Sequence, residues 1–299
     1  MSNSTDSQSR EVSIVLESYP HTRPIKDGQI KSPDICFNFT EYNPISKVFD
    51  VMVEKLCYDV CEMAVVTFLL ALDCGKPMKL IPAVMGGEFH HGSLWYEPSN
   101  GPLTPKDLKG QRVGVRAYTQ TTGLWVRGFL QEQYGVPAGD ITWVTSEAPH
   151  VAEYNDPSNV ELKEGADLAG MVRSGELAAV VIGPKQGTGA GLTRLVHDFD
   201  AVAAEWYAKH RQVPINHMVV VTDNFLINDP VSVREIYGML KRGHEACQPA
   251  DSTSATSIRF GVEKVWGALQ LAMCYAVEQK LISRAFEKNE IFGGMINYN

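Results

Sequence analysis

The sequence predicts an α/β fold of two lobes that face each other across a cleft. Strand-like apolar segments alternate with helical patterns along most of the 299 residues, which is typical of mainly parallel sheets flanked by helices. The segments fall into two sheet-like groups, at 11–97 and 110–195, and a further strand with closing helices follows them. The chain is also long enough for two domains of ordinary size, each with its own core.

The first group is recognised by alternating or continuous apolar residues in its strands and by apolar residues at helical spacing in its helices. We expect strands at 11–19, 35–42, 78–85 and 93–98, and helices at 44–59 and 61–76. Asp59 is the expected N-cap of the second helix, which places Glu62 in the first turn.

The second group repeats this alternation. We expect a strand at the end of 103–115, strands at 141–146 and 177–184, and helices at 121–136 and 165–176. Gly135 stands where the first of these helices should stop. A return strand at 214–226 and helical patterns at 230–247 and 258–286 complete the chain.

This order fits a two-lobed, periplasmic-binding-protein-like fold in which two crossing strands join the lobes. Domain one would comprise 11–97 and 220–299 and hold both termini, and domain two, 98–219, would be inserted. The segments 91–96 and 214–221 would be the crossings and would border the interdomain cleft, where ligands of such folds bind.

The composition excludes several classes of partner. The formal net charge of −8 and the pI near 5.5 argue against a nucleic-acid-binding surface. The first dozen residues are polar, without the apolar core of a secretory signal, and the most apolar run, 63–72, is too short to span a bilayer. We therefore expect a cytoplasmic protein without a membrane partner, and we expect its six cysteines to be buried free thiols.

Two histidine segments are the leading candidates for chemistry. His90 and His91 are adjacent on a segment that reads as extended, so their side chains should point to opposite faces. His217 is a polar residue within an apolar strand. If both crossings border the cleft, one histidine from each should face it.

Threonines at the start of the helix 121–136 provide a candidate anion site. Thr121 and Thr122 either cap this helix or lie beside free backbone amides that can bind a carboxylate. Arg127 lies about two turns further on, where a structural ion pair is favoured over ligand contact.

The glycine-rich stretch 183–195 has the spacing GxGxG instead of the GxGxxG of dinucleotide-binding folds, and we interpret it as a flexible rim loop. Lys185 within it is a candidate to reach an anion in the cleft. Glu62 is either a complement to the helix dipole or a cleft carboxylate. No pattern in the sequence indicates a metal or an organic cofactor, so we expect none.

Five stretches of the chain form a recognisable set: YDVCEMA, FHHGSLWY, LKGQRVGVRAYTQTTGLWVRGFLQEQYGV, PINHMVV and YAVEQKL. Together they resemble the 4,5-dihydroxyphthalate decarboxylase family, whose members have a periplasmic-binding-protein-like fold of type II. The resemblance implies that His91 and His217 are the family's two histidines. Positions 62, 118, 121 and 127 also match, whereas Gly87, His90 and Lys185 stand where the family has arginines.

The resemblance implies a cofactor-independent, non-oxidative decarboxylase, a carboxy-lyase, acting on a hydroxylated aromatic or heteroaromatic acid. Histidine suits the role of proton donor because its pKa lies near neutral pH. We expect His91 to protonate the ring carbon and His217 and Glu62 to handle the phenol, although the two histidines could exchange roles. The predicted substrate-binding residues are Tyr118, Thr121, Thr122, Lys185, Ser93 and Arg127.

The sequence is also compatible with a function other than catalysis. The same fold and cleft would serve a solute-binding protein that captures a small aromatic or amino-acid-like anion without turnover. The sequence leaves the exact substrate open, and it also leaves open whether the chain forms a homo-oligomer.

Overall fold

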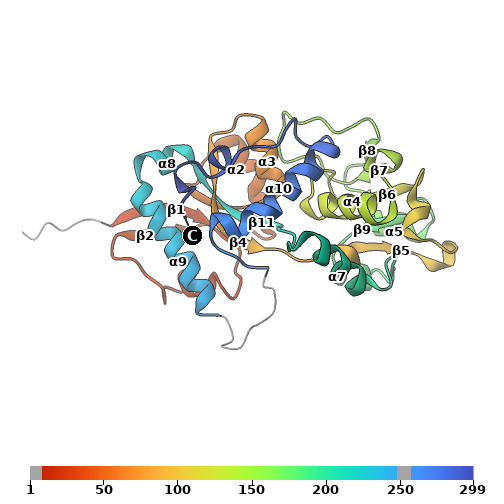
Figure 1. Cartoon of the computed structure of the whole chain (residues 1–299), viewed down its shortest axis with the longest axis horizontal. Coiled ribbons are helices and arrows are strands. Elements are labelled where there is room, and N and C mark those ends of the chain that lie inside the picture. The colour runs from red at the N-terminus through yellow and green to blue at the C-terminus, as the bar shows by residue number, and fades with distance from the viewer. Residues whose placement is uncertain (1–8, 248–256, 299) are drawn as a thin grey trace, which may run out of the picture.

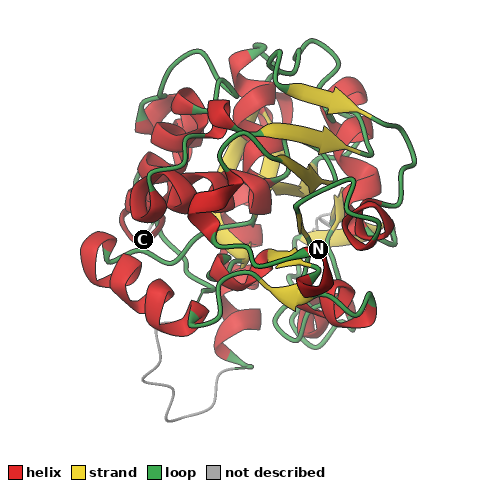
Figure 2. Cartoon of the chain, turned by 90° about the vertical axis from the view of Figure 1, so that its right-hand side faces the viewer, coloured by secondary structure: helices red, strands yellow, loops and turns green. Residues whose placement is uncertain are grey.

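The computed structural model describes residues 9–247 and 257–298 and has two lobes side by side along the long axis of the molecule (Figure 1). Each lobe contains one sheet, and helices cover the strands from outside (Figure 2). The predicted α/β, two-lobed fold is therefore confirmed.

The strands are β1 (Arg10–Val15), β2 (Ile35–Phe39), β3 (Val60–Ala64), β4 (Met78–Gly86), β5 (Leu94–Tyr96), β6 (Arg112–Val115), β7 (Thr142–Thr145), β8 (Val160–Leu162), β9 (Ala179–Val181), β10 (Thr193–Arg194) and β11 (His217–Thr222). The helices are α1 (Arg23–Lys26), α2 (Phe49–Lys55), α3 (Val65–Asp73), α4 (Thr121–Tyr134), α5 (Leu168–Arg173), α6 (Pro184–Gly189), α7 (Phe199–His210), α8 (Asp223–Asn228), α9 (Pro230–Glu245), α10 (Val262–Glu278) and α11 (Lys288–Phe292). Within the described residues, no helix combines the length and apolar character needed to cross a membrane.

The sheet of lobe one has the strand order β2-β1-β3-β11-β4. β1 is parallel to β2 and β3, whereas β11 runs antiparallel to both of its neighbours, β3 and β4. β11 has this direction because it brings the chain back from lobe two. All five residues of β3 are buried, as expected of a strand covered on both faces.

The sheet of lobe two has the order β10-β5-β9-β6-β7-β8. Here β6, β7, β8 and β9 form the parallel part, and β5, the first strand after the chain leaves lobe one, is antiparallel to β9. Each sheet is thus mixed, and each has an antiparallel strand where the chain enters from the other lobe.

The crossings between lobes occur a few residues earlier than the sequence predicts. The chain leaves the first sheet at Gly86 and joins the second at Leu94, and it returns from α7 to the first sheet at His217. The segment 94–96, expected in domain one, therefore lies in the sheet of lobe two. The segment 217–219, expected in domain two, lies in the sheet of lobe one.

The predicted helix at 61–76 is wrong in its first part, because 60–64 form the central strand β3 and α3 begins only at Val65. A continuous apolar run fits either a buried strand or a buried helix, so its periodicity did not separate the two elements. Asp59 consequently caps no helix. Its Oδ2 instead accepts hydrogen bonds from the backbone N–H and the hydroxyl of Ser13, at 2.9 and 2.7 Å.

Two smaller expectations also fail. The glycine-rich stretch contains the short helix α6 instead of a loop, and Gly187 packs against Trp95, whose ring would lie 2.2 Å from an added β-carbon. All six cysteines are free, as predicted, but Cys61 is the buried one and the other five are exposed.

The lobes contact each other through α4 and α10, which pack together at the junction (Figure 1). A β-carbon added to Gly128 of α4 would lie 2.3 Å from the ring of Tyr275 of α10, so only glycine permits this approach. Gln279, directly after α10, accepts a hydrogen bond from Arg127 Nε at 2.7 Å and donates one to the carbonyl of Leu124 at 3.0 Å.

Candidate functional site

A cleft of about 1020 Å³ opens between the lobes where several strands end. Ala64 and Val181 are the last residues of β3 and β9, and Arg116 and Ser146 directly follow β6 and β7. In α/β folds, ligands bind at the carboxyl ends of parallel strands. This cleft is therefore the first candidate for a functional site.

A buried carboxylate and a histidine form the polar centre of its lobe-one wall. Glu62, in the middle of β3, is fully buried, and its Oε1 lies 2.7 Å from Nδ1 of His217. Val219 of β11 is the pairing partner of Glu62, and His217 is two residues away, so the two side chains share one face of the sheet. The Tyr19 hydroxyl donates to Oε1 at 2.8 Å and the Glu17 backbone N–H donates to Oε2 at 3.0 Å.

This arrangement fixes the orientation of the His217 imidazole. A carboxylate at Nδ1 holds the proton on that nitrogen and leaves Nε2 as the atom available to a ligand. His217 lines the cleft, its side chain is 24% exposed, and its ring meets that of Phe49 edge to face at 5.4 Å between centroids. A histidine of this kind can donate or accept a proton at the cleft surface.

A second histidine, which the sequence analysis missed, enters the cleft from lobe two. His150 lies in the loop after β7, and its Nδ1 is 3.1 Å from the Thr67 hydroxyl on α3 of lobe one. Its ring also meets Phe49 edge to face, at 5.6 Å. Its position in the sequence could have indicated it, because His150 follows a predicted parallel strand and α/β folds bind ligands at the carboxyl ends of such strands.

The charged lining of the cleft has few free cations. Arg116 is bonded to Glu147 at 2.7 Å, and Asp50 and Asp167 add two more carboxylates. Lys47 also lines the cleft, and within residues 9–247 and 257–298 it makes no ion pair. An anionic ligand would therefore find one unpaired lysine, not a cluster of guanidinium groups.

The N-terminus of α4 supplies further donors. Gln120, Thr121 and Thr122 line the cleft, and no side chain caps the helix there. The interpretation that Thr121 and Thr122 cap this helix is therefore wrong. The Thr121 hydroxyl instead accepts a hydrogen bond from the Val66 amide at 3.2 Å. The first-turn amides of this 14-residue helix can bind an anion.

Neither His90 nor His91 lines the cleft. His91 is stacked on Phe129 at 4.4 Å and its Nε2 lies 2.9 Å from Gln133 Oε1, so it is packed against α4 and is not part of the cleft lining. His90 is buried, with Nε2 2.6 Å from Oδ1 of Asn216, which does line the cleft. The prediction that His91 faces the cleft is wrong because 91–93 form a 3-10 turn, in which side chains do not alternate.

Glu62 lies behind His217 and does not itself line the cleft, and four further predicted residues also lie outside the lining. Arg127 is buried, donates to the Tyr118 carbonyl at 2.7 Å and lies 4.0 Å from the Tyr118 ring, so neutral acceptors replace the expected ion pair. The Tyr118 hydroxyl donates to the Gln279 carbonyl at 3.0 Å. Ser93 is buried in the turn after His91, and Lys185 is exposed on α6, where its neighbour Gln186 lines the cleft instead.

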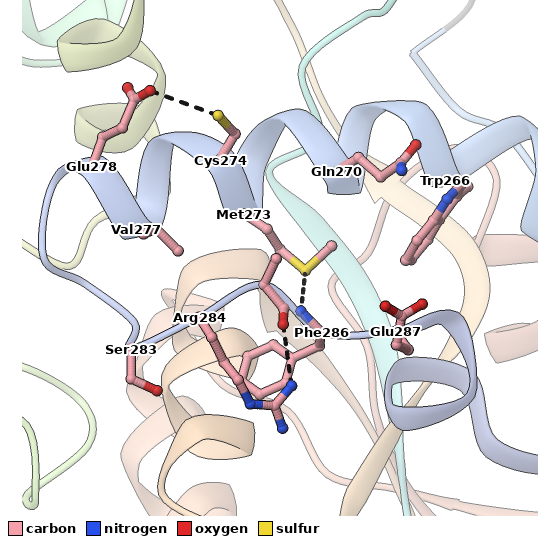
Figure 3. Close-up of a pocket in the computed structure, with 11 residues that line it drawn as sticks. Trp266, Gln270, Met273, Cys274, Val277, Glu278, Ser283, Arg284, Phe286 and Glu287 are labelled. Atoms are coloured by element: carbon pink, nitrogen blue, oxygen red, sulfur yellow. Dashed lines mark hydrogen bonds between the residues drawn. The ribbon is translucent and has the colours of Figure 1, made fainter.

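A second hollow, of about 730 Å³, lies between α10 and the segment 283–287 (Figure 3). Its side chains include Trp266, Met273 and Cys274, and the Cys274 thiol points along the helix to Glu278 at 3.7 Å. Among the described residues that line it, Arg284 is the one basic side chain, and both of its terminal nitrogens are bonded to Glu290. This hollow thus lacks the acid–base pair that distinguishes the cleft.

In the described part of the chain, no group of three or more histidine, cysteine, aspartate or glutamate side chains is placed to hold a metal ion. The polar centre of the cleft consists of hydrogen-bonded pairs, Glu62 with His217 and Thr67 with His150. Its side chains are suited to proton transfer and to binding an organic anion.

Comparison with solved structures shows the same fold. The periplasmic aliphatic sulphonate binding protein SsuA from Escherichia coli superposes with a TM-score of 0.60 at 14% identity, over 93% of this chain and 95% of SsuA. A mutant of the desulfurization enzyme DSZB in complex with biphenyl-2-sulfinic acid gives 0.55 at 13% identity, over 92% and 94%. The fold therefore serves both binding proteins and an enzyme, and it does not choose between them.

Comparison of sequences is more specific. No family model matches the chain. A 4,5-dihydroxyphthalate decarboxylase of Comamonas testosteroni is 30% identical over 231 residues, which are 71% of this chain and 68% of the relative. A protein of the same name from Pseudomonas putida is 30% identical over 211 residues, or 66% and 81%. The resemblance seen in the motifs is thus confirmed, and the chain belongs to the 4,5-dihydroxyphthalate decarboxylase family.

Proposed function

We propose that this protein is a cofactor-independent, non-oxidative decarboxylase of a hydroxylated aromatic or heteroaromatic carboxylic acid. Both named relatives are decarboxylases of such an acid. The observation that carries the proposal is the Glu62–His217 pair at the cleft, because it supplies a held imidazole beside a cavity large enough for an aromatic ring.

His217 takes the role of proton donor that the sequence analysis gave to His91. In the proposed step, Nε2–H of the imidazolium protonates the ring carbon that carries the carboxylate. The bond from that carbon to the carboxylate then breaks, its electron pair returns to the ring, and CO2 leaves. Glu62 orients the ring by accepting a hydrogen bond from Nδ1–H, and solvent returns the proton to His217 after each turnover.

The carboxylate needs an aligned binding site before it leaves. The first-turn amides of α4, with the Thr122 hydroxyl and Lys47, are the donors on the cleft wall that suit it. Backbone amides carry no full charge, so they orient the carboxylate without opposing its conversion to neutral CO2.

The test is CO2 release from hydroxybenzoates, phthalates and heteroaromatic acids by the wild type and by His217→Gln and Glu62→Gln. We expect His217→Gln to lower kcat about 10³-fold and Glu62→Gln to lower it about 10²-fold, with little change in Tm. His197→Gln is the matched control, because His197 is an exposed histidine outside the cleft lining.

Two results would contradict the proposal. A His217→Gln protein that keeps more than a tenth of the wild-type kcat would remove the imidazole from the mechanism. An aromatic acid that raises the Tm of the wild type but is recovered unchanged would instead support the solute-binding reading.

A further inference from the structure

We propose that His150 is a second catalytic residue, which removes the proton from a substrate hydroxyl while His217 protonates the ring. This inference rests on the proposed function and deepens it, because it requires a substrate with a hydroxyl ortho or para to the carboxylate. The two catalytic histidines would then come from different lobes, His217 from β11 and His150 from the loop after β7.

The position of His150 is fixed from lobe one. Its Nδ1 lies 3.1 Å from the Thr67 hydroxyl, and its ring meets the edge of Phe49, which His217 also contacts. When Nδ1 carries the proton, Thr67 accepts it as a hydrogen bond and Nε2 is the free base. No hydrogen bond from the described residues occupies that Nε2.

Both imidazoles lie close enough to each other to contact one bound aromatic ring. Their centroids lie 5.4 and 5.6 Å from that of Phe49, which limits the distance between them to at most about 11 Å. With contacts of about 3 Å, both histidines can reach the same hydroxybenzoate within that limit when one imidazole approaches the carboxylate-bearing carbon from the face of the ring.

The surroundings of His150 suit a base. Burial lowers the pKa of His150, Arg116 and His217 lower it further, and Asp50 and Glu147 oppose this change. His150 is therefore neutral at neutral pH, as a base must be. Nδ1 of His217 lies 2.7 Å from the Glu62 carboxylate, whereas Nδ1 of His150 faces only the Thr67 hydroxyl.

The combined step balances. Nε2 of His150 takes the hydroxyl proton, and the electron pair of the O–H bond moves through the ring to form a C–H bond with the proton of His217. Loss of CO2 returns an electron pair to the ring and leaves a phenolate. His150 gives its proton back to this phenolate, and His217 is reprotonated from solvent.

The experiment compares two hydroxybenzoates at one pH. In the first, the hydroxyl is protonated, and in the second, electron-withdrawing ring substituents keep it ionised. We expect His150→Gln to lower kcat about 10²-fold for the first substrate and less than about threefold for the second, because the second needs no base. His217→Gln should lower kcat for both, and His197→Gln should lower it for neither.

Each alternative result has a distinct meaning. Equal losses for both substrates would show that His150 only shapes the cleft, and full activity on both would remove it from the reaction. Wild-type protein that releases no CO2 from either substrate, or from any acid in the wider screen, would overturn the proposed function itself.

Discussion

Single buried histidines show how strongly the surroundings of a side chain determine its protonation. Burial lowers the pKa of both His90 and His91 to about 4, although Asn216 and Gln133 each oppose the change through a hydrogen bond. Both pKa values lie below the ordinary value of 6.5, so the unfolded chain binds more protons than the folded one between about pH 6.5 and pH 4. The free energy of unfolding must therefore decrease as the pH falls through that range.

Replacing His91 removes one of these groups. We expect His91→Phe to reduce the loss of stability between pH 7 and pH 5 by about 2 kcal/mol, because one buried imidazole no longer has to charge on unfolding. Urea unfolding at the two pH values measures this difference within each variant. The same variant should retain CO2 release within a few-fold, since His91 is packed on Phe129 outside the cleft. An unchanged pH dependence would contradict this account.

At the same level, the sequence identified His217 because it is a polar residue in an apolar strand. It placed Glu62 in the first turn of a helix, and the family resemblance, not the strand pattern, marked this residue as part of the site. It did not identify His150, whose partner Thr67 lies 83 residues away. The prediction that His91 faces the cleft was wrong because alternation holds only while the backbone is extended, and 91–93 form a turn.

Among the secondary-structure elements, α4 was predicted closely because Gly135 marks its C-terminal end. It runs from Thr121 to Tyr134, and Gly135 ends it with a φ of 68°. In contrast, the boundary between β3 and α3 has no glycine, proline or capping side chain to mark it. The residues of β3 form a strand because they pair with β1 and β11, and these tertiary contacts are not visible in the apolar run that β3 shares with α3.

The end of α4 allows a direct test of the backbone argument. We expect Gly135→Ala to lower the free energy of unfolding by about 1 kcal/mol, because a side chain disfavours the left-handed conformation that Gly135 adopts. An added β-carbon would meet no atom within 4 Å, so the cost comes from the backbone and not from a clash. Gly139→Ala is the control, because its site is equally open and its φ is not positive. Equal urea midpoints for the two variants would refute the argument.

In the whole molecule, the chain order predicted the two lobes, but the contacts that join them depend on residues far apart in the sequence. Arg127 and Gln279 are 152 residues apart and are bonded at 2.7 Å. Arg127 is buried, and its pKa is lowered by that burial, so its guanidinium depends on the acceptors provided across the junction. The sequence matched Arg127 to the family's site, whereas the structure supports a role in holding α4 to α10.

Gln279→Leu tests whether this junction makes the lobes unfold together. The change removes the acceptor of Arg127 Nε and the donor to the Leu124 carbonyl, which should lower the free energy of unfolding by about 2–4 kcal/mol and weaken the link between the lobes.

Tryptophan fluorescence reports chiefly on lobe two, because four of the five tryptophans, at 95, 125, 143 and 206, belong to it. Far-UV circular dichroism reports on both lobes. We expect the two signals to give one urea transition in the wild type and in Gln270→Leu, a change at an exposed glutamine of the same helix. In Gln279→Leu the two transitions should separate, because lobe two loses its support from α10. Coincident transitions with an unchanged midpoint in Gln279→Leu would mean that the other contacts between α4 and α10, including Gly128 with Tyr275, couple the lobes without it.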